Sequence, residues 1–177
     1  MGQYYKPAIL GEDRKTVEKW FHSWDYECGL KLMEQSWIKN PFVRAVEKTI
    51  FQNPSIIVWA GDYADEDVDD TNVYNRCEDS QQSQVIDTND FDIDFSYYIV
   101  NHSKKCFVDK NNIVPDNDGW RVHPLPLLTC EGNGRGGGDY RGVSDLIGIW
   151  ARDVISVEES IENFKDYEEI VFDLFEV

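Results

Sequence analysis

The chain has 177 residues, of which 41% are hydrophobic, and it carries a formal net charge of -17. That length suits one compact domain with a single core, and six Trp, nine Tyr and nine Phe exclude an intrinsically disordered chain. The negative charge argues against direct binding to nucleic acid or to an anionic membrane surface.

The N-terminal third predicts strands around one helix. QYYKPAIL and TVEKWFHSW, on either side of the polar turn GEDRK, predict two strands, with Pro7 at an edge position or a strand end. Asn40 and Pro41 form a helix cap followed by a first-turn proline, and the apolar residues after them recur at helical spacing. We therefore expect an amphipathic helix over residues 41–52, followed by a buried strand at SIIVWAG.

Residues 62–94 are polar, acidic and rich in Gln, Asn and Ser, which predicts a flexible insertion with a short helix near TNVYNRC. The insertion ends in DFDIDF, whose alternation of carboxylates and apolar residues is typical of a half-buried strand. It holds twelve acidic side chains against one basic one, and residues 158–177 hold eight against one. Because the rest of the chain is nearly neutral, the acidity is regional.

The second half of the chain predicts mainly strands. SYYIVNHSKKCFVDK indicates a hairpin, VHPLPLLTC an extended segment whose prolines disfavour a helix, and LIGIWARDVISV and EEIVFDLF two further strands. IIVWAGDYA and IGIWARDVI share a pattern that would bring Asp62 and Asp153 to one end of a sheet, although coincidence explains the pattern better. The predicted fold is α+β, a single domain over 1–177 with a mainly antiparallel sheet and one or two short helices.

The segment EGNGRGGGDYRG, residues 131–142, is the most specific functional pattern in the chain. It matches neither a P-loop nor a dinucleotide-binding fingerprint. Consecutive glycines can turn several backbone N–H groups into one concavity, and two arginines add charge for a phosphate. The alternative is a wide loop whose glycines adopt positive φ and whose charges pair within the protein. The ligand-binding residues of the first interpretation are Gly134, Arg135, Gly136, Gly137, Gly138, Asp139, Arg141 and, upstream, His123.

Two DxDxD strings, starting at Asp65 and Asp90, raise the question of calcium. Neither has the Gly at the sixth position and the Glu at the twelfth position that an EF-hand loop needs. A solvated acidic surface is the better interpretation and weak cation binding is the alternative, so we predict neither a metal site nor a cofactor.

Cysteines and histidines give no named site. Four cysteines lack a C-x-x-C pair and zinc-site spacing, which predicts buried reduced thiols, and three histidines lack any catalytic motif, which favours structural positions. No apolar run is long enough to span a bilayer and MGQYYKP lacks the apolar core of a signal peptide, so a cytoplasmic protein is expected. These residues are Cys28, Cys77, Cys106, Cys130, His22, His102 and His123.

The motifs MGQYYKP, GLKLME, WAGDYADE, NHSKKCFVDK and GNGRGGGDYRG together resemble a family of small bacterial and bacteriophage-associated proteins. The resemblance covers most of the chain outside the acidic insertion. It implies a bacterial or phage cytoplasmic setting and a role in conflict between phage and host, and it carries over no catalytic residues.

Two hypotheses follow. The first is a non-enzymatic inhibitor or immunity-like protein, possessing no cofactor, that docks its carboxylates on a basic protein partner such as a nucleic-acid-binding enzyme, with aromatic anchors Tyr63, Tyr74 and Trp59. The second is an enzyme or sensor that binds a nucleotide or phosphate ligand at 131–142, with Asp139 or His123 transferring a proton. The partner-binding residues of the first hypothesis are Asp62, Asp65, Asp67, Asp69, Asp70 and Tyr63.

Overall fold

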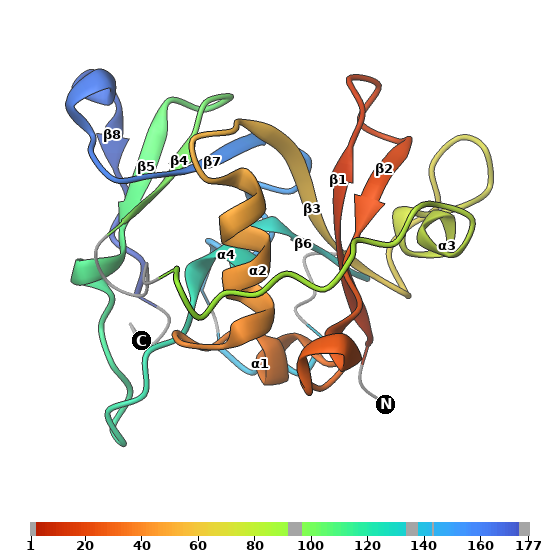
Figure 1. The fold of residues 1–177 in the computed structure, drawn as a ribbon, viewed down its shortest axis with the longest axis horizontal. Helices are drawn as coiled ribbons and strands as arrows, with labels where there is room; N and C mark the ends of the chain where they lie inside the picture. Colours follow the sequence, from red (N-terminus) through yellow and green to blue (C-terminus); the bar gives the residue numbers. More distant parts are fainter. Residues whose placement is uncertain (1–2, 92–96, 134–137, 143, 174–177) are drawn as a thin grey trace.

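The computed structural model describes residues 3–91, 97–133, 138–142 and 144–173. In this part of the chain eight strands form one mixed sheet of order β2-β1-β3-β7-β4-β5-β8, and β6 pairs with β3 (Figure 1). The strands are β1 (Tyr5–Leu10), β2 (Val17–Trp20), β3 (Ser55–Gly61), β4 (Tyr98–Asn101), β5 (Cys106–Asp109), β6 (Cys130–Glu131), β7 (Val154–Glu158) and β8 (Glu168–Glu169). The helices are α1 (Leu32–Gln35), α2 (Pro41–Ile50), α3 (Val73–Glu78) and α4 (Pro124–Thr129), with 3-10 turns η1 (Ser23–Tyr26), η2 (Lys110–Asn112) and η3 (Glu162–Phe164).

The α+β prediction is confirmed. All strand neighbours are antiparallel except the β3–β6 and β5–β8 pairs, which are parallel. The two hairpins predicted on sequence grounds, β1–β2 and β4–β5, are both present. The four short helices exceed the one or two that we expected.

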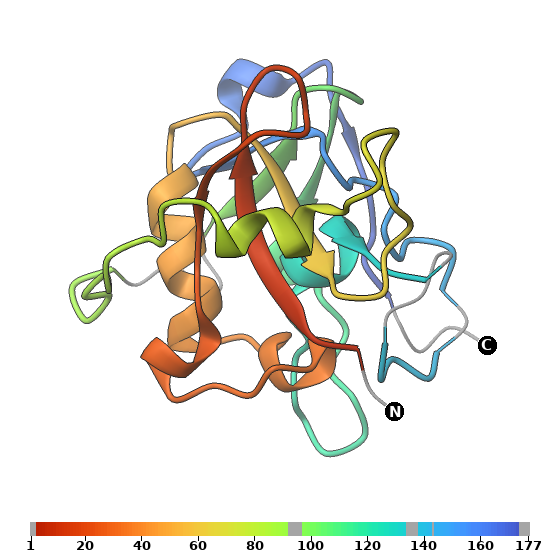
Figure 2. The same ribbon diagram turned by 90° about the vertical axis from the view of Figure 1, so that its right-hand side faces the viewer.

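The central strand β3 separates two cores because successive side chains of a strand point to opposite faces of a sheet. Ile57 and Trp59 belong to the larger core with apolar residues of α2 and α4, whereas Val58 and Ala60 belong to a smaller core with α3. Figure 2 shows α3 on the near side of β1 and β3, and α4 behind them. The helices therefore cover both faces of this half of the sheet.

Helix α2 begins as predicted, because the Asn40 side-chain oxygen accepts a hydrogen bond of 2.9 Å from the Phe42 amide and Pro41 occupies the first helical position. The helix ends at Ile50, two residues before the predicted end. Phe42, Val46 and Ile50 are fully buried against the larger core.

The segment VHPLPLLTC is not extended: it forms α4. Pro124 and Pro126 lie in the first turn, where the missing amide hydrogen leaves no helical hydrogen bond unmade. His123 caps the helix, its Nδ1 accepting from the Leu125 amide at 3.2 Å. The prolines thus initiate this helix, so the prediction that they disfavour a helix here was wrong.

Only the last part of LIGIWARDVISV is a strand, β7. The residues before it form turns in which Gly148 and Arg152 have positive φ of 73° and 63°. A Cβ on Gly148 would lie 2.7 Å from the carbonyl oxygen of Cys130, so this turn needs glycine. Asp62 follows β3, whereas Asp153 precedes β7 and its carbonyl accepts from the Ile57 amide, so the shared Trp-Ala pattern is a coincidence.

Two further strand predictions fall partly outside the described residues. EEIVFDLF contributes only β8, and its last two residues lie outside the described part of the chain. Most of DFDIDF also lies outside the described residues, and its first two residues are not in a strand.

The acidic segment, for which the composition predicts a flexible insertion, makes hydrogen bonds with the rest of the protein. Its start is bonded to the N-terminal segment, because the Asp62 amide donates to the Tyr4 carbonyl at 3.0 Å, and within the segment the Asn72 side chain donates to the Ala64 carbonyl at 3.0 Å and caps α3. Further on, Gln82 forms a bridge with Trp20, and the Ile86 amide donates to the hydroxyl of Tyr26 at 3.0 Å.

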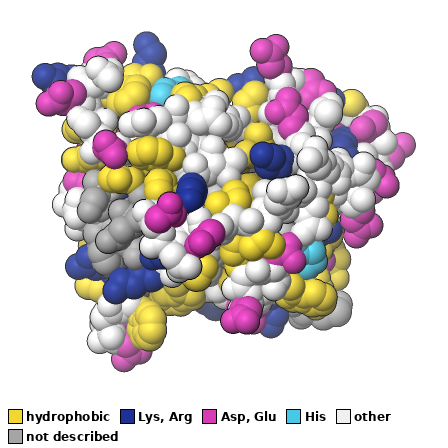
Figure 3. Space-filling view, viewed as in Figure 1, with side chains coloured by type: hydrophobic (Ala, Val, Ile, Leu, Met, Phe, Trp, Pro, Cys, Tyr) yellow, Lys and Arg dark blue, Asp and Glu magenta, His cyan; other side chains and the backbone are white. Residues whose placement is uncertain are grey.

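The first part of one acidic tract, residues 62–79, lies at the β2 edge of the sheet, whereas residues 162–169 of the other tract lie at the β8 edge. Helix α3 packs beside β1 and β2, whereas η3 and β8 lie beyond β5 at the other edge (Figure 1). Figure 3 shows acidic side chains gathered at the right of the view, in the region of α3, and a separate mixed group at the upper left. Residues 80–91 of the first tract cross α2, where Lys48 Nζ binds Asp90, and reach Tyr97, whose hydroxyl donates to Glu159 of the second tract at 3.2 Å.

All four cysteines are free, and three of them are buried while Cys28 is half-buried. Burial raises the pKa of the Cys77 and Cys130 thiols to about 12 and that of Cys106 to about 11. These thiols are structural, because the thiolate is the reactive form of cysteine.

Candidate binding surface

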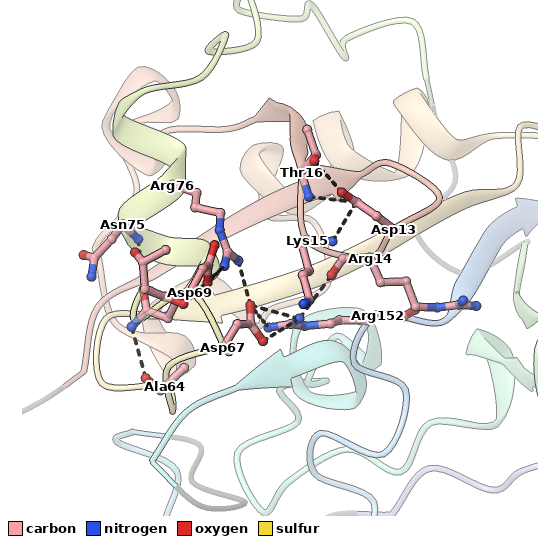
Figure 4. Close-up of polar contacts among 12 residues, drawn as sticks. Asp13, Arg14, Lys15, Thr16, Ala64, Asp67, Asp69, Asn75, Arg76 and Arg152 are labelled. Atoms are coloured by element: carbon pink, nitrogen blue, oxygen red, sulfur yellow. Dashed lines mark hydrogen bonds and ion pairs between the residues drawn. The ribbon is translucent and has the colours of Figure 1, made fainter.

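The acidic turn, which we define as residues 62–70, is fixed from the inside by Asp67. Its carboxylate accepts from Arg76 Nη1 of α3 at 2.7 Å and from Arg152 Nη1 at 3.1 Å (Figure 4). Burial alone would raise the pKa of Asp67, but its hydrogen bonds to the two guanidinium groups and their charge lower it below its usual value. The Asp67 side chain is only 17% exposed, so it contributes little to the outer surface.

Arg152 connects the turn to two other parts of the fold. Its Nη2 donates to Glu131 Oε1 of β6 at 2.5 Å, and its Nη1 donates to the Arg14 carbonyl at 3.1 Å. Arg14, in the β1–β2 turn, returns a bond from its Nε to the Arg152 carbonyl at 3.0 Å. Four separate chain segments are therefore held together around one guanidinium group.

The remaining side chains of the acidic turn face outward. Tyr63 is 50% exposed and Val68 is 91% exposed, and Asp65, Glu66 and Asp70 around them are exposed carboxylates. Asp69 is also exposed but is paired with Arg76 Nη2 at 2.5 Å. The turn thus presents an aromatic and an aliphatic side chain beside three carboxylates that form no ion pair with another described residue.

Tyr4 extends this surface from the start of β1. Its amide donates to Asp62 Oδ1 at 3.0 Å, and the Asp62 amide donates to the Tyr4 carbonyl at 3.0 Å, so the two segments are fastened in both directions. Tyr4 is exposed. The pKa of Tyr74 is raised to about 12, first by burial and then by the negative charges of Asp62 and Glu78. The Tyr74 hydroxyl therefore lies near two carboxylates of this surface.

One cation of the protein itself, the ammonium group of Lys6, already lies beside this surface. Lys6 Nζ lies 4.1 Å from the ring centroid of Tyr74, 4.8 Å from that of Trp20 and 3.7 Å from Glu78 Oε1. A tyrosine face beside a carboxylate is a suitable environment for an ammonium or guanidinium group.

The structure divides the predicted partner-binding residues into two groups. Tyr63, Asp65 and Asp70 are exposed, whereas Asp62, Asp67 and Asp69 bind other parts of the protein, Asp62 the Tyr4 amide and the other two arginines. The predicted anchor Trp59 is fully buried, and its Nε1 donates to Gln35 Oε1 at 2.7 Å, so it cannot contact a partner. Tyr4 and Val68 were not predicted, although both lie next to residues that were.

The glycine segment is only partly described. Gly134, Arg135, Gly136 and Gly137 lie outside the described residues. Gly138 has φ of 56°, and a Cβ there would lie 3.1 Å from the Tyr5 ring. Asp139 Oδ1 accepts from the Met33 amide at 2.9 Å, which fastens the segment to α1, and Arg141 is exposed.

His123 is not available to a ligand at this segment. It is buried, its Nδ1 caps α4, and its Nε2 lies 3.0 Å from Glu47 Oε1 of α2. Glu47 Oε1 also accepts from Lys110 Nζ at 2.7 Å. Burial alone would raise the pKa of Glu47, but His123 and Lys110 lower it further than burial raises it. This fully buried cluster is structural, and it was not predicted from the sequence although Glu47 lies on the apolar face of α2.

The other two histidines also have structural partners. His22 Nδ1 accepts from the Trp24 amide at 3.2 Å and caps η1. His102 Nε2 lies 2.7 Å from the oxygen of Ser156, whose hydroxyl donates to Glu158 Oε1 at 2.6 Å. Because that proton is committed to Glu158 and Ser156 is fully buried, this is not an activated serine nucleophile.

Among the described residues, no group of three or more His, Cys, Asp or Glu side chains is placed to hold a metal ion. In the same part of the chain no helix is both long and apolar enough to cross a membrane. No family model, no curated protein and no solved structure matches the chain. The family resemblance of the sequence motifs therefore stays a prediction.

Proposed function

We propose that this is a non-enzymatic binding protein that docks the acidic turn, together with Tyr4 and Tyr74, on a basic surface of a target protein. The observation that carries the proposal is the internal anchoring of Asp67 by Arg76 and Arg152, which leaves Asp65, Glu66 and Asp70 pointing outward on a fixed backbone. An inhibitor or immunity-like role in conflict between phage and host is the setting that the sequence resemblance implies.

Three physical effects favour such docking. A turn already fixed in the free protein loses little conformational entropy on binding. Carboxylates around an interface accelerate association with a basic partner and disfavour acidic ones. Tyrosines supply large contact areas, and Tyr63 and Tyr4 are both exposed at this surface.

The structural use of the histidines supports a binding role over a catalytic one. Each of the three has a defined partner within the fold, and two of them are helix caps. A general base must reach a substrate proton, and His123, the residue closest in sequence to the glycine segment, is buried.

The experiment compares two triple variants with equal charge change. The first, Asp65→Asn, Glu66→Gln and Asp70→Asn, neutralises the acidic turn while keeping Asp67 and Asp69 paired. Asn also suits position 70, where φ is 59°. The second neutralises three exposed carboxylates at the other edge of the sheet: Glu162→Gln, Asp166→Asn and Glu168→Gln.

Each protein is used as bait in a bacterial host lysate, and captured proteins are quantified by mass spectrometry and then purified for affinity measurement. The proposal predicts a basic protein that binds the wild type and the second variant with equal affinity, and the first variant at least tenfold more weakly. Equal loss in both variants, or undiminished binding by the first, would show that the acidic turn is not the docking surface.

A further inference from the structure

A cavity of about 400 Å³ lies between α1 and residues 139–142, on a part of the molecule separate from the acidic turn. Its apolar walls are Met33, Trp37, Val122 and Tyr140. The volume is within the range of small-molecule sites, and a largely apolar wall with a few polar groups is typical of them.

The walls of the cavity are held in place by the surrounding structure. Trp37 and Val122 form a backbone bridge, and the Trp37 ring meets the edge of Trp120 at a centroid distance of 6.0 Å. The Tyr140 hydroxyl accepts from the Ser144 amide at 3.2 Å. Two aromatic rings are thus positioned at the cavity before any ligand binds, which favours a planar aromatic group.

Two carboxylates at the cavity each have one oxygen in use. Asp139 Oδ1 accepts from the Met33 amide at 2.9 Å, and Asp116 Oδ1 accepts from the amides of Asp118 and Trp120 at 3.0 and 2.8 Å. Neither Oδ2 atom has a hydrogen-bond partner among the described residues. Two fixed acceptors therefore remain for N–H or O–H groups of a ligand.

Arg141 supplies the positive charge at the cavity. It is exposed and makes no ion pair with another described residue, in contrast to Arg76 and Arg152, which are both bound to carboxylates. A free guanidinium fork binds a phosphate through two parallel hydrogen bonds. The cavity thus combines aromatic surface, acceptors for hydroxyl or amine donors, and a group for an anion.

We propose that this cavity binds a nucleoside monophosphate, with its base against Trp37 and Tyr140, its hydroxyl or amine donors on Asp116 and Asp139, and its phosphate on Arg141. Each part of the ligand has a counterpart of the right chemistry on a described residue. The inference rests on residues other than those of the acidic turn, so it stands or fails independently of the proposed function.

The test measures binding of AMP, GMP, CMP and UMP to the full chain by isothermal titration calorimetry. The four nucleosides and inorganic phosphate serve as fragments. We expect at least one nucleotide to bind with a Kd below 1 mM. We expect its nucleoside to bind more weakly, because it cannot use Arg141, and phosphate alone to show no measurable binding. If no nucleotide binds, or if phosphate binds as well as the nucleotides, the proposal is overturned.

Variants locate the binding to this cavity. Arg141→Gln should weaken nucleotide binding roughly ten- to a hundredfold and leave nucleoside binding unchanged, since it removes only charge-assisted hydrogen bonds. Trp37→Leu should weaken both, and its melting curve shows whether it is folded. Lys165→Gln, an equal loss of charge at an exposed residue that follows η3 and does not line the cavity, should change neither. Nucleotide affinity that is unaffected by Arg141→Gln contradicts the assignment.

Discussion

Asp67 and Arg152, 85 residues apart in the sequence, are joined through Nη1 and Oδ1 at 3.1 Å, and each side chain is only 17% exposed. This pair, with Arg76 on the other side of the carboxylate, turns an Asp-rich stretch into a fixed loop. Truncating Asp67 removes the negative charge that two arginines contact in a partly buried site. This loss lowers the free energy of unfolding more than the loss of a surface ion pair does.

We therefore predict that Asp67→Ala lowers the free energy of unfolding by about 2 kcal/mol. Asp69→Ala is the matched control, because Asp69 pairs with the same Arg76 but is 53% exposed. The control should cost less than about 1 kcal/mol. Urea denaturation of both variants gives the comparison, and equal losses would mean that Asp67 has no special anchoring role.

The pKa of Asp67 provides a second, pH-dependent prediction. Because the folded-state pKa is lowered, the stabilisation by this group is present above its ordinary pKa of about 4 and is lost as the pH falls toward the folded value. The stability difference between the wild type and Asp67→Asn should therefore be largest at pH 6 to 7 and shrink below pH 4. Urea midpoints measured across this range give the profile. A difference that stays constant down to pH 3 would show that folding does not lower the pKa of Asp67.

The buried cluster around Glu47 predicts a larger effect. Glu47→Gln removes a buried negative charge that contacts Lys110 Nζ and His123 Nε2, and we expect a loss of about 3 to 5 kcal/mol in the free energy of unfolding. Adding Lys110→Met to Glu47→Gln should recover part of that loss, because the positive charge that Glu47 contacted is removed as well. Thermal and urea unfolding of the single and double variants tests the coupling, and a double variant less stable than the single one argues against it.

Gly148 and Gly119 form a matched pair for backbone strain. Both have positive φ, 73° and 85°, but a Cβ on Gly148 would meet the Cys130 carbonyl at 2.7 Å whereas one on Gly119 meets nothing within 4 Å. Alanine at position 119 should cost about 1 kcal/mol from the dihedral alone. Alanine at 148 should cost at least about 1 kcal/mol more, since the backbone must also move. Equal melting temperatures for the two variants would contradict the close approach at Gly148.

Local signals predicted the elements that depend on neighbouring residues. Asn40 and Pro41 start α2 through contacts within one turn, so a helix was predictable there. The same local chemistry at His123 and Pro124 was interpreted as extended because two prolines in three positions were taken as helix breakers, although both fit the first turn. A histidine cap followed by proline was the signal available in the sequence.

The candidate surfaces depend on residues far apart in the sequence, which composition cannot reveal. The acidic turn resembles a flexible tract until Arg152 is placed beside it, and the turn containing Gly148 and Arg152 is concealed by the strand-like pattern LIGIW. The cavity likewise joins Trp37, Val122 and Tyr140, three residues that share no motif. The sequence did indicate which chemical groups the two surfaces carry. One tract holds carboxylates and a tyrosine, and the other holds an arginine after a run of glycines.

The most direct test of the docking surface is hydrogen–deuterium exchange of the protein alone and with the captured basic partner. The account predicts slower exchange on binding in peptides that cover Tyr4 and residues 62–74, with no change in peptides from 159–169 at the other edge of the sheet. Slower exchange confined to 159–169, or to the glycine segment, with the acidic turn unchanged, would contradict it.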